Sequence, residues 1–449
     1  MDNKYIFKIL LHIGLGAMLY FINIFPKLFF YGVIVYFLFQ IIVSPKKDKI
    51  TEVLKACAYL VGAEVIFRMT NAGIFYESSK YFVIIFVLFG MFYNGVSNKS
   101  YPYFLYLICL VPSIIVAGVN IDFDSNLRTN VAFVLSGPVC LGISTLYCYN
   151  KKISLKQLLD VLLYLALPIV SLTTYLFFYS PSIKSILSGT QSNFAASGGF
   201  GPNQVATTLG LGMFVFCVNY FLNSKTLTLK IINVILFGAI SFRGIVTFSR
   251  GGVITAIIMI IAFLFVIYSK TNWRQKNTIL TSLSLLLVFS FAVWVISSNQ
   301  TEGLIDKRYA NQDITGKQKK DVSAGRVELF TGELEGFFNE PFVGVGASGM
   351  KEQREETLGR VIATHNELSR LLSEHGILGV IILLILIIHP LVYRAKNKSN
   401  YFFYACLAFW FATINHSAMR IAAPGFIYAL ALLNIRNEKR SLHRKRVIQ

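Results

Sequence analysis

The stretch from Gly251 to Ser269 decides the fold class of this protein. It reads GGVITAIIMIIAFLFVIYS and contains no charged side chain. Because a helix needs about 20 mostly apolar residues to cross the hydrocarbon core of a bilayer, this stretch predicts a membrane-spanning helix. Lys270, Arg274 and Lys276 follow it, and another apolar stretch begins near residue 279. The same alternation of apolar stretches and short polar segments continues along most of the chain.

About fourteen candidate spans are found in this way. They lie near residues 6–24, 27–44, 52–69, 79–96, 101–119, 130–148, 157–179, 204–222, 230–248, 251–269, 279–297, 376–393, 401–418 and 421–435. The chain of 449 residues is 55% hydrophobic and only 14% charged, whereas a soluble domain carries about 25% charged residues. We therefore expect an all-α polytopic membrane helix bundle of about 12–14 transmembrane helices, and exclude a soluble enzyme, a disordered chain and a nucleic-acid-binding module.

The segments between the candidate spans alternate in charge, which predicts the topology. Short basic segments carry Lys46, Lys47, Lys49, Lys99, Lys151, Lys152, Lys156, Lys225, Lys270, Arg274, Lys276, Arg394, Lys396 and Lys398, and the C-terminal tail is also basic. The intervening segments at 120–129 and 180–203 are poor in cations. By the positive-inside rule both termini are expected in the cytoplasm. The net charge of +20 is thus mainly a topology signal, although the tail could also bind anionic lipid.

This topology divides the chain into four parts. Residues 1–297 are expected to form transmembrane helices with a glycine-rich outer segment at 180–203. Residues 298–375 are expected to form a long extracytoplasmic loop that contains short amphipathic helices, residues 376–435 the last transmembrane helices, and residues 436–449 a basic cytoplasmic tail. Within the loop, residues 298–364 hold 9 Lys and Arg and 11 Asp and Glu. Because loops of this length in compact proteins are usually functional, we expect the functional site on the outer side.

Two features of the long loop precede its most informative segment. Ser323 can cap a helix that runs to about Phe338, with Glu328, Glu333 and Glu335 on the side opposite to its apolar residues. Arg326 lies in the first turn, where the helix dipole disfavours a cation. This position suggests an external anionic partner, with a salt bridge as the alternative. The run from Gly344 to Gly349 has the form GxGxxG but lacks a preceding strand, so we interpret it as a turn that brings the backbone close to another element.

The segment from Thr364 to Gly379 reads THNELSRLLSEHGILG and is expected to form a short amphipathic helix that leads into the next span. His365 lies near its start, at the membrane edge. A histidine in this position can titrate near neutral pH and act as a base toward a hydroxyl group. The alternative is a structural histidine that only makes hydrogen bonds.

Charged residues within the candidate spans are the other candidates. Arg243 and Arg250 are seven residues apart, close to two helical turns, so we expect both on one helical face. No Asp or Glu lies between Asp160 and Glu302, and paired arginines bind phosphate or pyrophosphate well. An anionic ligand is therefore the preferred interpretation. Of the other intramembrane charges, Glu64 and Arg68 are expected to form an internal ion pair. His416 and Arg420 lie at the last outward turn, from which reaching the same pocket is the less favoured alternative.

Together these motifs resemble the O-antigen ligase/polymerase superfamily, the membrane glycosyltransferases of bacterial surface-polysaccharide assembly. The resemblance covers roughly residues 195–380. It rests on His365-Asn366 followed after nine residues by Gly376-Ile377-Leu378-Gly379, on Ser249-Arg250-Gly251, and on Gly325-Arg326 followed by Pro341 and Gly344-Val345-Gly346.

The resemblance implies transfer of a glycan from undecaprenyl pyrophosphate to an acceptor hydroxyl on the periplasmic face of the bacterial inner membrane. His365, Arg250 and Arg326 would be catalytic, and Arg243, Asn366, Asn203, Gly376 and Gly379 would bind the pyrophosphate or glycan. No metal or cofactor is expected, because arginines can stabilise the leaving charge. An O-antigen ligase that uses lipid A-core as acceptor is favoured. A polymerase with a carrier-linked acceptor is the close alternative, and a lipid-linked glycan transporter is a weaker one.

Overall fold

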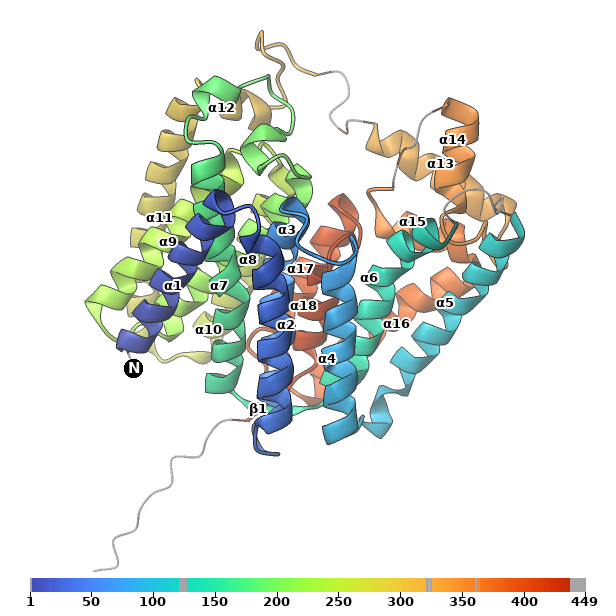
Figure 1. The fold of residues 1–449 in the computed structure, drawn as a ribbon, viewed down its shortest axis with the longest axis horizontal. Coiled ribbons are helices and arrows are strands. Elements are labelled where there is room, and N and C mark those ends of the chain that lie inside the picture. The colour runs from blue at the N-terminus through green and yellow to red at the C-terminus, as the bar shows by residue number, and fades with distance from the viewer. Residues whose placement is uncertain are drawn as a thin grey trace, which may run out of the picture.

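The computed structural model describes residues 2–120, 127–319, 323, 325–359, 362 and 364–436. These residues form a bundle of long helices with a cap of shorter helices at one end (Figure 1). The all-α fold class expected from the sequence is confirmed. The basic tail predicted at 436–449 lies outside the described residues except for Arg436, and most of the cation-poor segment at 120–129 lies outside them too.

Each of the fourteen apolar stretches corresponds to one helix. These helices are α1 (Asp2–Phe21), α2 (Phe25–Val43), α3 (Lys49–Met69), α4 (Ser78–Asn94), α5 (Tyr101–Asn120), α6 (Leu127–Cys148), α7 (Leu155–Tyr179), α8 (Pro202–Leu222), α9 (Leu227–Ile245), α10 (Arg250–Lys270), α11 (Trp273–Gln300), α16 (Ile377–Lys396), α17 (Phe403–His416) and α18 (Ala423–Ala431). Four shorter helices, α12 (Leu304–Tyr309), α13 (Arg326–Asn339), α14 (Gly349–Leu358) and α15 (Glu367–His375), form within the long loop.

Ten helices of the described part of the chain are long and apolar enough to cross a membrane. The other four of the fourteen are α3, which is 21 residues long but contains Glu52, Lys55, Glu64 and Arg68, and α4, α17 and α18, which have 17, 14 and 9 residues. The chain is therefore a multi-pass membrane protein, and the sequence located its helices correctly.

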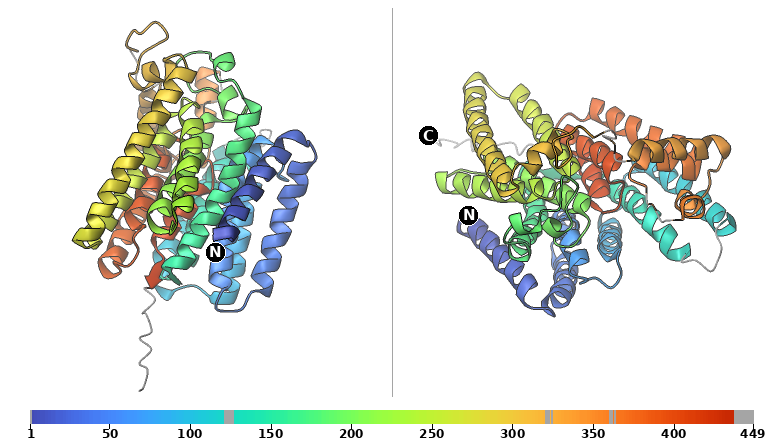
Figure 2. Two further views of the ribbon diagram at one scale, coloured as in Figure 1. Left: turned by 90° about the vertical axis from the view of Figure 1, so that its left-hand side faces the viewer. Right: turned by 90° about the horizontal axis from the view of Figure 1, so that it is seen from above.

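The two ends of the bundle differ in character. The helices of the long loop lie at one end, and the N-terminus lies toward the other (Figures 1 and 2). At that second end, β1 (Lys152–Ser154) pairs in parallel with β2 (Asn434–Arg436), with Ile153 opposite Ile435. This pairing joins the start of α7 to the end of α18. The long loop is thus at the opposite end from the basic segment at 151–156.

A buried cluster of charges connects α3 to the turn between α17 and α18. Arg68 donates to Glu64 and Glu77 at 2.5 and 2.9 Å, and Lys80 lies 2.6 Å from Glu77. The ion pair expected between Glu64 and Arg68 is therefore present. Arg68 also donates to the carbonyl of Arg420, so the cluster holds the residues at 417–422 in place under the long loop.

Candidate functional site

A polar cleft of about 600 Å³ lies at the end of the bundle that carries the long loop. Its lining comes from segments far apart in the sequence: the residues at 191–203, the start of α10, the arm that follows α12, the start of α13, and the residue before the N-cap of α15. The side chains that define its chemistry are Asn203, Arg250, Arg308, Lys319, Arg326 and His365. Four of these side chains are cationic, and no carboxylate is among the described residues that line the cleft.

Arg250 reaches the cleft because α9 ends at Ile245 and the chain turns sharply before α10 begins. Phe248 has a φ of +58° at this turn, and the hydroxyl of Thr247 accepts a hydrogen bond from the amide of Ser249 at 3.1 Å. Added Cβ atoms at Gly251 and Gly252 would overlap the ring of His416 and the backbone of Ala206. The two glycines therefore allow α10 to start tightly against α8 and α17.

The arm around α12 folds back over this turn and supplies further cations. Arg308 donates from Nε to the carbonyl of Phe248 at 3.1 Å, and Arg250 donates to the carbonyl of Arg308 and to the side chain of Asn311. Lys319 is held nearby because its amide donates to the carbonyl of Asn311 at 2.9 Å. The guanidinium groups of Arg250, at the start of α10, and of Arg308, on α12, therefore both line the cleft.

Like charges in the cleft destabilise one another. Burial lowers the pKa of Arg308, and the charges of Arg250 and Arg326 lower it further. The pKa of Lys319 is lowered by burial and then by Arg308 and Arg250, and the pKa of Arg326 by burial and Arg250. A bound anion would relieve this repulsion, so the cleft is electrostatically complementary to phosphate groups.

His365 lies beside these cations as a neutral imidazole. Burial lowers its pKa to about 4, and the neighbouring charges of Arg420, Arg326 and Arg354 act in the same direction. Its Nδ1 is buried and has no hydrogen-bond partner among the described residues. Its carbonyl accepts a hydrogen bond from the amide of Ala418 at 3.1 Å. At neutral pH this side chain can therefore accept a proton or a hydrogen bond from a hydroxyl group.

A buried network holds α15, and with it His365, against α13 and α14. Glu333 accepts hydrogen bonds from Arg354, Thr364 and Ser369. The side chain of Glu333 is 1% exposed, so the expectation that it lies with Glu328 and Glu335 on a polar side of α13, opposite its apolar residues, is wrong. The reason is that α13 packs on α15 rather than lying free at the membrane surface.

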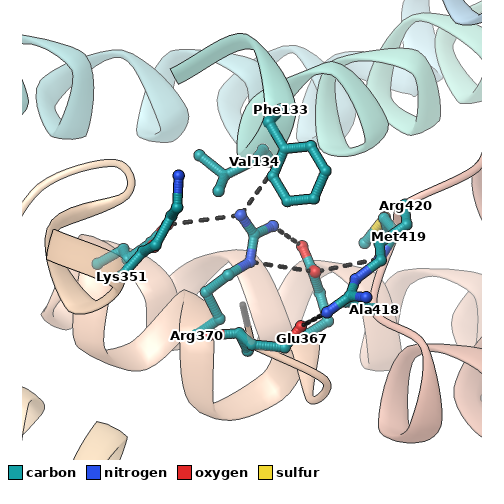
Figure 3. A pocket seen from close by; sticks show the side chains of 10 residues that line it. Phe133, Val134, Lys351, Glu367, Arg370, Ala418, Met419 and Arg420 are labelled. Carbon is teal, nitrogen blue, oxygen red and sulfur yellow. Dashed lines mark hydrogen bonds and ion pairs between the residues drawn. The ribbon is translucent and has the colours of Figure 1, made fainter. Parts of the chain in front are cut away.

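A second contact holds the other side of α15 (Figure 3). Arg370 donates to Glu367 and to the carbonyl of Val134 on α6. Glu367 also accepts from the amide of Met419 at 3.3 Å, and Arg420 donates to the carbonyl of Thr364 at 2.7 Å. The cavity between these groups has a volume of about 20 Å³, which is room for about one water molecule. The cluster therefore positions the His365 segment and is too small to bind a glycan.

The structure brings together four of the residues selected from the sequence, which are Asn203, Arg250, Arg326 and His365. Asn203 is oriented by the hydroxyl of Ser249, which donates to its side-chain oxygen at 2.7 Å. His416 and Arg420 do not line the cleft. His416 lies beneath Gly251 and contacts Thr207, and Arg420 lies behind His365 in the contact described above.

Arg243 lies outside the cleft, and the expectation that it shares a helical face with Arg250 is wrong. The helix that carries it ends at Ile245, so α9 and α10 are separate helices with a turn between them. The guanidinium of Arg243 is fully buried, donates to Ser180 and to the carbonyl of Ala196, and stacks over Phe177 at 5.3 Å. Its contacts fix the segment at 180–196 that forms one wall of the cleft.

Asn366, Gly376 and Gly379 also lie outside the cleft, and they shape α15. The side chain of Asn366 caps α15 by accepting hydrogen bonds from the amides of Leu368 and Ser369. Gly376 has a φ of +58°, and an added Cβ there would overlap the backbone of Phe342. A Cβ at Gly379 would overlap the carbonyl of Leu371. The geometry thus gives these residues a role in the junction of α15 with α16, and gives their expected role in substrate binding no direct support.

The glycine-rich run at 344–349 is a turn, as expected. Gly344 and Gly346 have φ values of +73° and +89°, and the amides of Val345 and Ala347 donate to the carbonyls of Ser373 and Ser113 at 2.9 Å. The element that this backbone approaches is the end of α15, together with α5.

The sequence-based selection missed Arg308, Asn311 and Lys319. They belong to the polar, lysine-rich stretch at 307–320, whose fold could not be read from periodicity. One signal was present: cations on the outer side of a chain that otherwise concentrates them in basic segments are out of place by the positive-inside rule.

Comparison with known families agrees with this site. The sequence model of the O-Antigen ligase family matches residues 232–384, which include Arg250, Arg308, Arg326 and His365. A search of curated proteins found no match. The resemblance stated from the sequence motifs is confirmed. The match at residues 232–384 supports a membrane glycosyltransferase of the O-antigen ligase/polymerase type.

Proposed function

We propose that the cleft binds the pyrophosphate of an undecaprenyl-pyrophosphate-linked glycan and that the protein transfers the glycan to a hydroxyl of lipid A-core, as an O-antigen ligase. The observation that carries this proposal is the composition of the cleft. Arg250, Arg308, Lys319 and Arg326 surround a neutral histidine, and no described carboxylate neutralises them. Such a site favours a ligand with several negative charges and a reacting hydroxyl group.

The cations act mainly on the leaving group. When the bond from the anomeric carbon to the pyrophosphate oxygen breaks, the electron pair stays with the pyrophosphate and its negative charge grows. The guanidinium of Arg250 is already fixed by Asn311 and by the carbonyl of Arg308, and that of Arg308 by the carbonyl of Phe248, so both stabilise this charge without reorganising. This electrostatic stabilisation is the part of the chemistry that a metal would otherwise supply.

His365 acts on the acceptor. Its imidazole accepts the proton of the acceptor hydroxyl while the hydroxyl oxygen forms the new bond to the anomeric carbon. The low pKa of the free site would make it a weak base, but a bound pyrophosphate places negative charge beside it and favours the protonated form. Donor binding therefore raises the pKa of His365 and prepares it for proton transfer.

An apolar groove next to the cleft fits the lipid part of the donor. It has a volume of about 620 Å³ and lies between α9, α10 and α11. Trp294 and Tyr309 line its end, and Tyr309 is the direct neighbour of Arg308, which lines the cleft. A ligand with a polyprenyl chain and a pyrophosphate head would place the chain in the groove and the head among the arginines.

The site is proposed to face the periplasm, with both termini of the protein in the cytoplasm of a bacterial cell and the bundle in the inner membrane. The support is the charge pattern: the cleft lies at the end of the bundle opposite the basic segment at 151–156 and β2. Residues 298–375 then form the periplasmic catalytic loop.

A reconstituted assay tests the function. Purified protein in proteoliposomes is given carrier-linked glycan together with two acceptors, lipid A-core and carrier-linked repeat. A ligase forms glycan-linked lipid A-core and releases undecaprenyl pyrophosphate. Extension of the carrier-linked repeat instead would identify a polymerase, and absence of transfer to either acceptor by active, correctly inserted protein would contradict both.

A further inference from the structure

A second large groove lies between α1 and α2 and shares no lining residue with the cleft. It has a volume of about 800 Å³ and is closed at its back by residues of α3 and α7. The two helices meet at one end and diverge toward the end that carries the N-terminus (Figures 1 and 2). The groove is therefore a wedge that opens toward the basic end of the bundle.

The wedge is held open because α1 and α2 are each packed against a different helix. α1 is fixed to α7: a Cβ at Gly16 would overlap the backbone of Ser171, whose hydroxyl donates to the carbonyl of His12 at 2.7 Å. α2 is fixed to α3 through Phe30, whose ring lies 5.1 Å from that of Phe67. The helices cannot close on each other without breaking these contacts.

The lining of the wedge is polarised along its length. Lys4, Lys8, Tyr36 and Tyr164 lie toward the N-terminal end of α1, and the antiparallel α2 brings Phe25, Leu28 and Phe29 to the other end together with Leu11 and Leu15 of α1. A bilayer lipid has the same polarity, with a charged head at the interface and apolar chains below it. Lys and Tyr are the side chains that membrane proteins place at head-group level.

The charge at the open end is positive. The only charged side chains that line the described groove are Lys4 and Lys8. Lys8 contacts the hydroxyl of Tyr164 at 3.4 Å and lies 4.5 Å from its ring centre, and no described carboxylate pairs with either lysine. The nearby carboxylates, Glu52 and Asp160, lie 3.1 and 3.4 Å from Lys55.

We propose that this wedge binds one anionic glycerophospholipid, with its phosphate between Lys4 and Lys8 and an acyl chain along Gly32 and Leu28. The bound lipid fills the gap between α1 and α2, supplies the missing counter-charge, and fixes the N-terminal helix pair to the bundle. The site is independent of the donor groove, because it involves other helices and its charges lie at the other end.

Gly32 gives a sharp test. It lines the wedge, and a Cβ added there meets no atom within 4 Å. The Cβ of a leucine at this position therefore meets no protein atom, and Gly32→Leu places its side chain in the groove. Gly14→Leu is the matched control, because Gly14 on α1 also has no atom within 4 Å of an added Cβ but does not line the wedge.

The experiment measures retained lipid by native mass spectrometry after proteoliposomes of phosphatidylglycerol and phosphatidylcholine are dissolved in mild detergent. We expect wild type and Gly14→Leu each to retain one phosphatidylglycerol per chain. Gly32→Leu should not retain this lipid. Lys4→Gln with Lys8→Gln should retain lipid but lose the preference for phosphatidylglycerol. Glycan transfer by the proteoliposomes reports correct folding of each variant.

Equal retention by wild type and Gly32→Leu would overturn the proposal, as would retention that does not distinguish the two lipids in wild type. A stable dimer that Gly32→Leu disrupts would show instead that a second copy of the chain covers the wedge. If Gly32→Leu fails to accumulate in the membrane, the lysine variant alone decides: an unchanged lipid preference would overturn the assignment of the head group.

Discussion

The cleft and the charge cluster of α3 both bring several charged side chains together inside a membrane protein, but they differ in their balance. On α3 and α4, Arg68 and Lys80 face Glu64 and Glu77, two cations against two carboxylates. In the cleft, Arg250, Arg308, Lys319 and Arg326 face no described carboxylate. Charges buried in balanced groups hold helices together, whereas an unbalanced group of cations needs an anion from outside.

The charge cluster on α15, formed by Arg370, Glu367 and Glu374, is also close to balanced. Arg370 contacts Glu367 and Glu374, which would leave one excess negative charge. Burial raises the pKa of Glu374 to about 8, although the charge of Arg370 opposes the shift. Glu374 is therefore mostly protonated at neutral pH, and the cluster is close to neutral. The cleft has no carboxylate among its described lining residues that could balance its cations.

The largest effect on glycan transfer is expected from substitution of His365, the proposed general base. His365→Ala should lower the rate of glycan transfer by roughly 10²- to 10⁴-fold, the usual contribution of general acid–base catalysis, with unchanged accumulation of the protein. His389→Ala is the control: His389 stacks on Tyr149, away from the cleft, and its substitution should preserve transfer. Comparable rates for His365→Ala and wild type in the reconstituted assay would remove His365 from the mechanism.

Breaking one member of each charge group should give opposite phenotypes. Arg68→Ala leaves Glu64 and Glu77 underneutralised in the core and should destabilise the protein by about 3–5 kcal/mol, which thermal unfolding in detergent can measure. Arg250→Ala removes repulsion in the cleft and should leave the unfolding temperature unchanged or higher. It should lower transfer by roughly 10²- to 10³-fold. If Arg250→Ala were the destabilised variant and Arg68→Ala the inactive one, the contrast between the two groups would be refuted.

Lys319, a cleft residue that the sequence pattern did not reveal, can be compared with its neighbour Lys317. Lys319 lines the cleft, and Lys317 is exposed two residues away. Lys319→Ala should raise the KM for the carrier-linked donor by roughly 5- to 10-fold, about 1 kcal/mol for one partly screened charge, and the effect should shrink at high salt. Lys317→Ala should leave the KM unchanged. Identical KM values for the two variants would exclude Lys319 from donor binding.

The protonated state of Glu374 predicts a dependence of stability on pH. Its pKa is raised from the ordinary glutamate value of 4.5 to about 8 in the folded chain, mainly by burial. A raised carboxyl pKa means that the folded state binds more protons, so its contribution to stability is complete below about 4.5 and is lost as the pH rises to about 8. Glu374→Gln should reduce the fall in unfolding temperature across this window. An unaltered slope in this variant would show that Glu374 is ionised in the folded protein.

The smallest effect separates helix capping from substrate binding. Asn366→Ala should lower the unfolding free energy by about 1 kcal/mol, the usual cost of removing an N-cap. Asn366→Asp should restore stability, because an Asp side chain also accepts the two amide hydrogen bonds. A rise in donor KM with unchanged stability would instead support the role in substrate binding that the sequence motif suggested.

The sequence was sufficient for the helices and for part of the site. Long apolar stretches predict spans because backbone groups inside a bilayer must be paired, and every one of the fourteen stretches proved helical. Arg250 and Arg326 were found because a charge at a span end or at the start of a loop helix conflicts with its surroundings, and His365 because a histidine at the membrane edge can act as a base. Such conflicts between a residue and its local environment are visible without a structure.

The remaining site residues depend on contacts between distant segments. The break between Arg243 and Arg250 follows from the positive φ of Phe248, which the apolar pattern does not signal. Arg308 and Lys319 enter the cleft only because the arm after α12 folds back through the bridge of Gln312 with Gln318. Glu333 is buried because α13 packs on α15. No periodicity in the chain encodes these tertiary contacts.

Binding of the product undecaprenyl pyrophosphate tests the central claim most directly. Its addition to the purified protein in detergent should raise the unfolding temperature of wild type and of Arg243→Lys, and should have no effect on Arg250→Ala or on the double variant of Arg308 and Arg326 to Ala. This result would place the pyrophosphate in the cleft of unbalanced cations. Equal stabilisation of the cleft variants and wild type, or its selective loss in Arg243→Lys, would contradict the account.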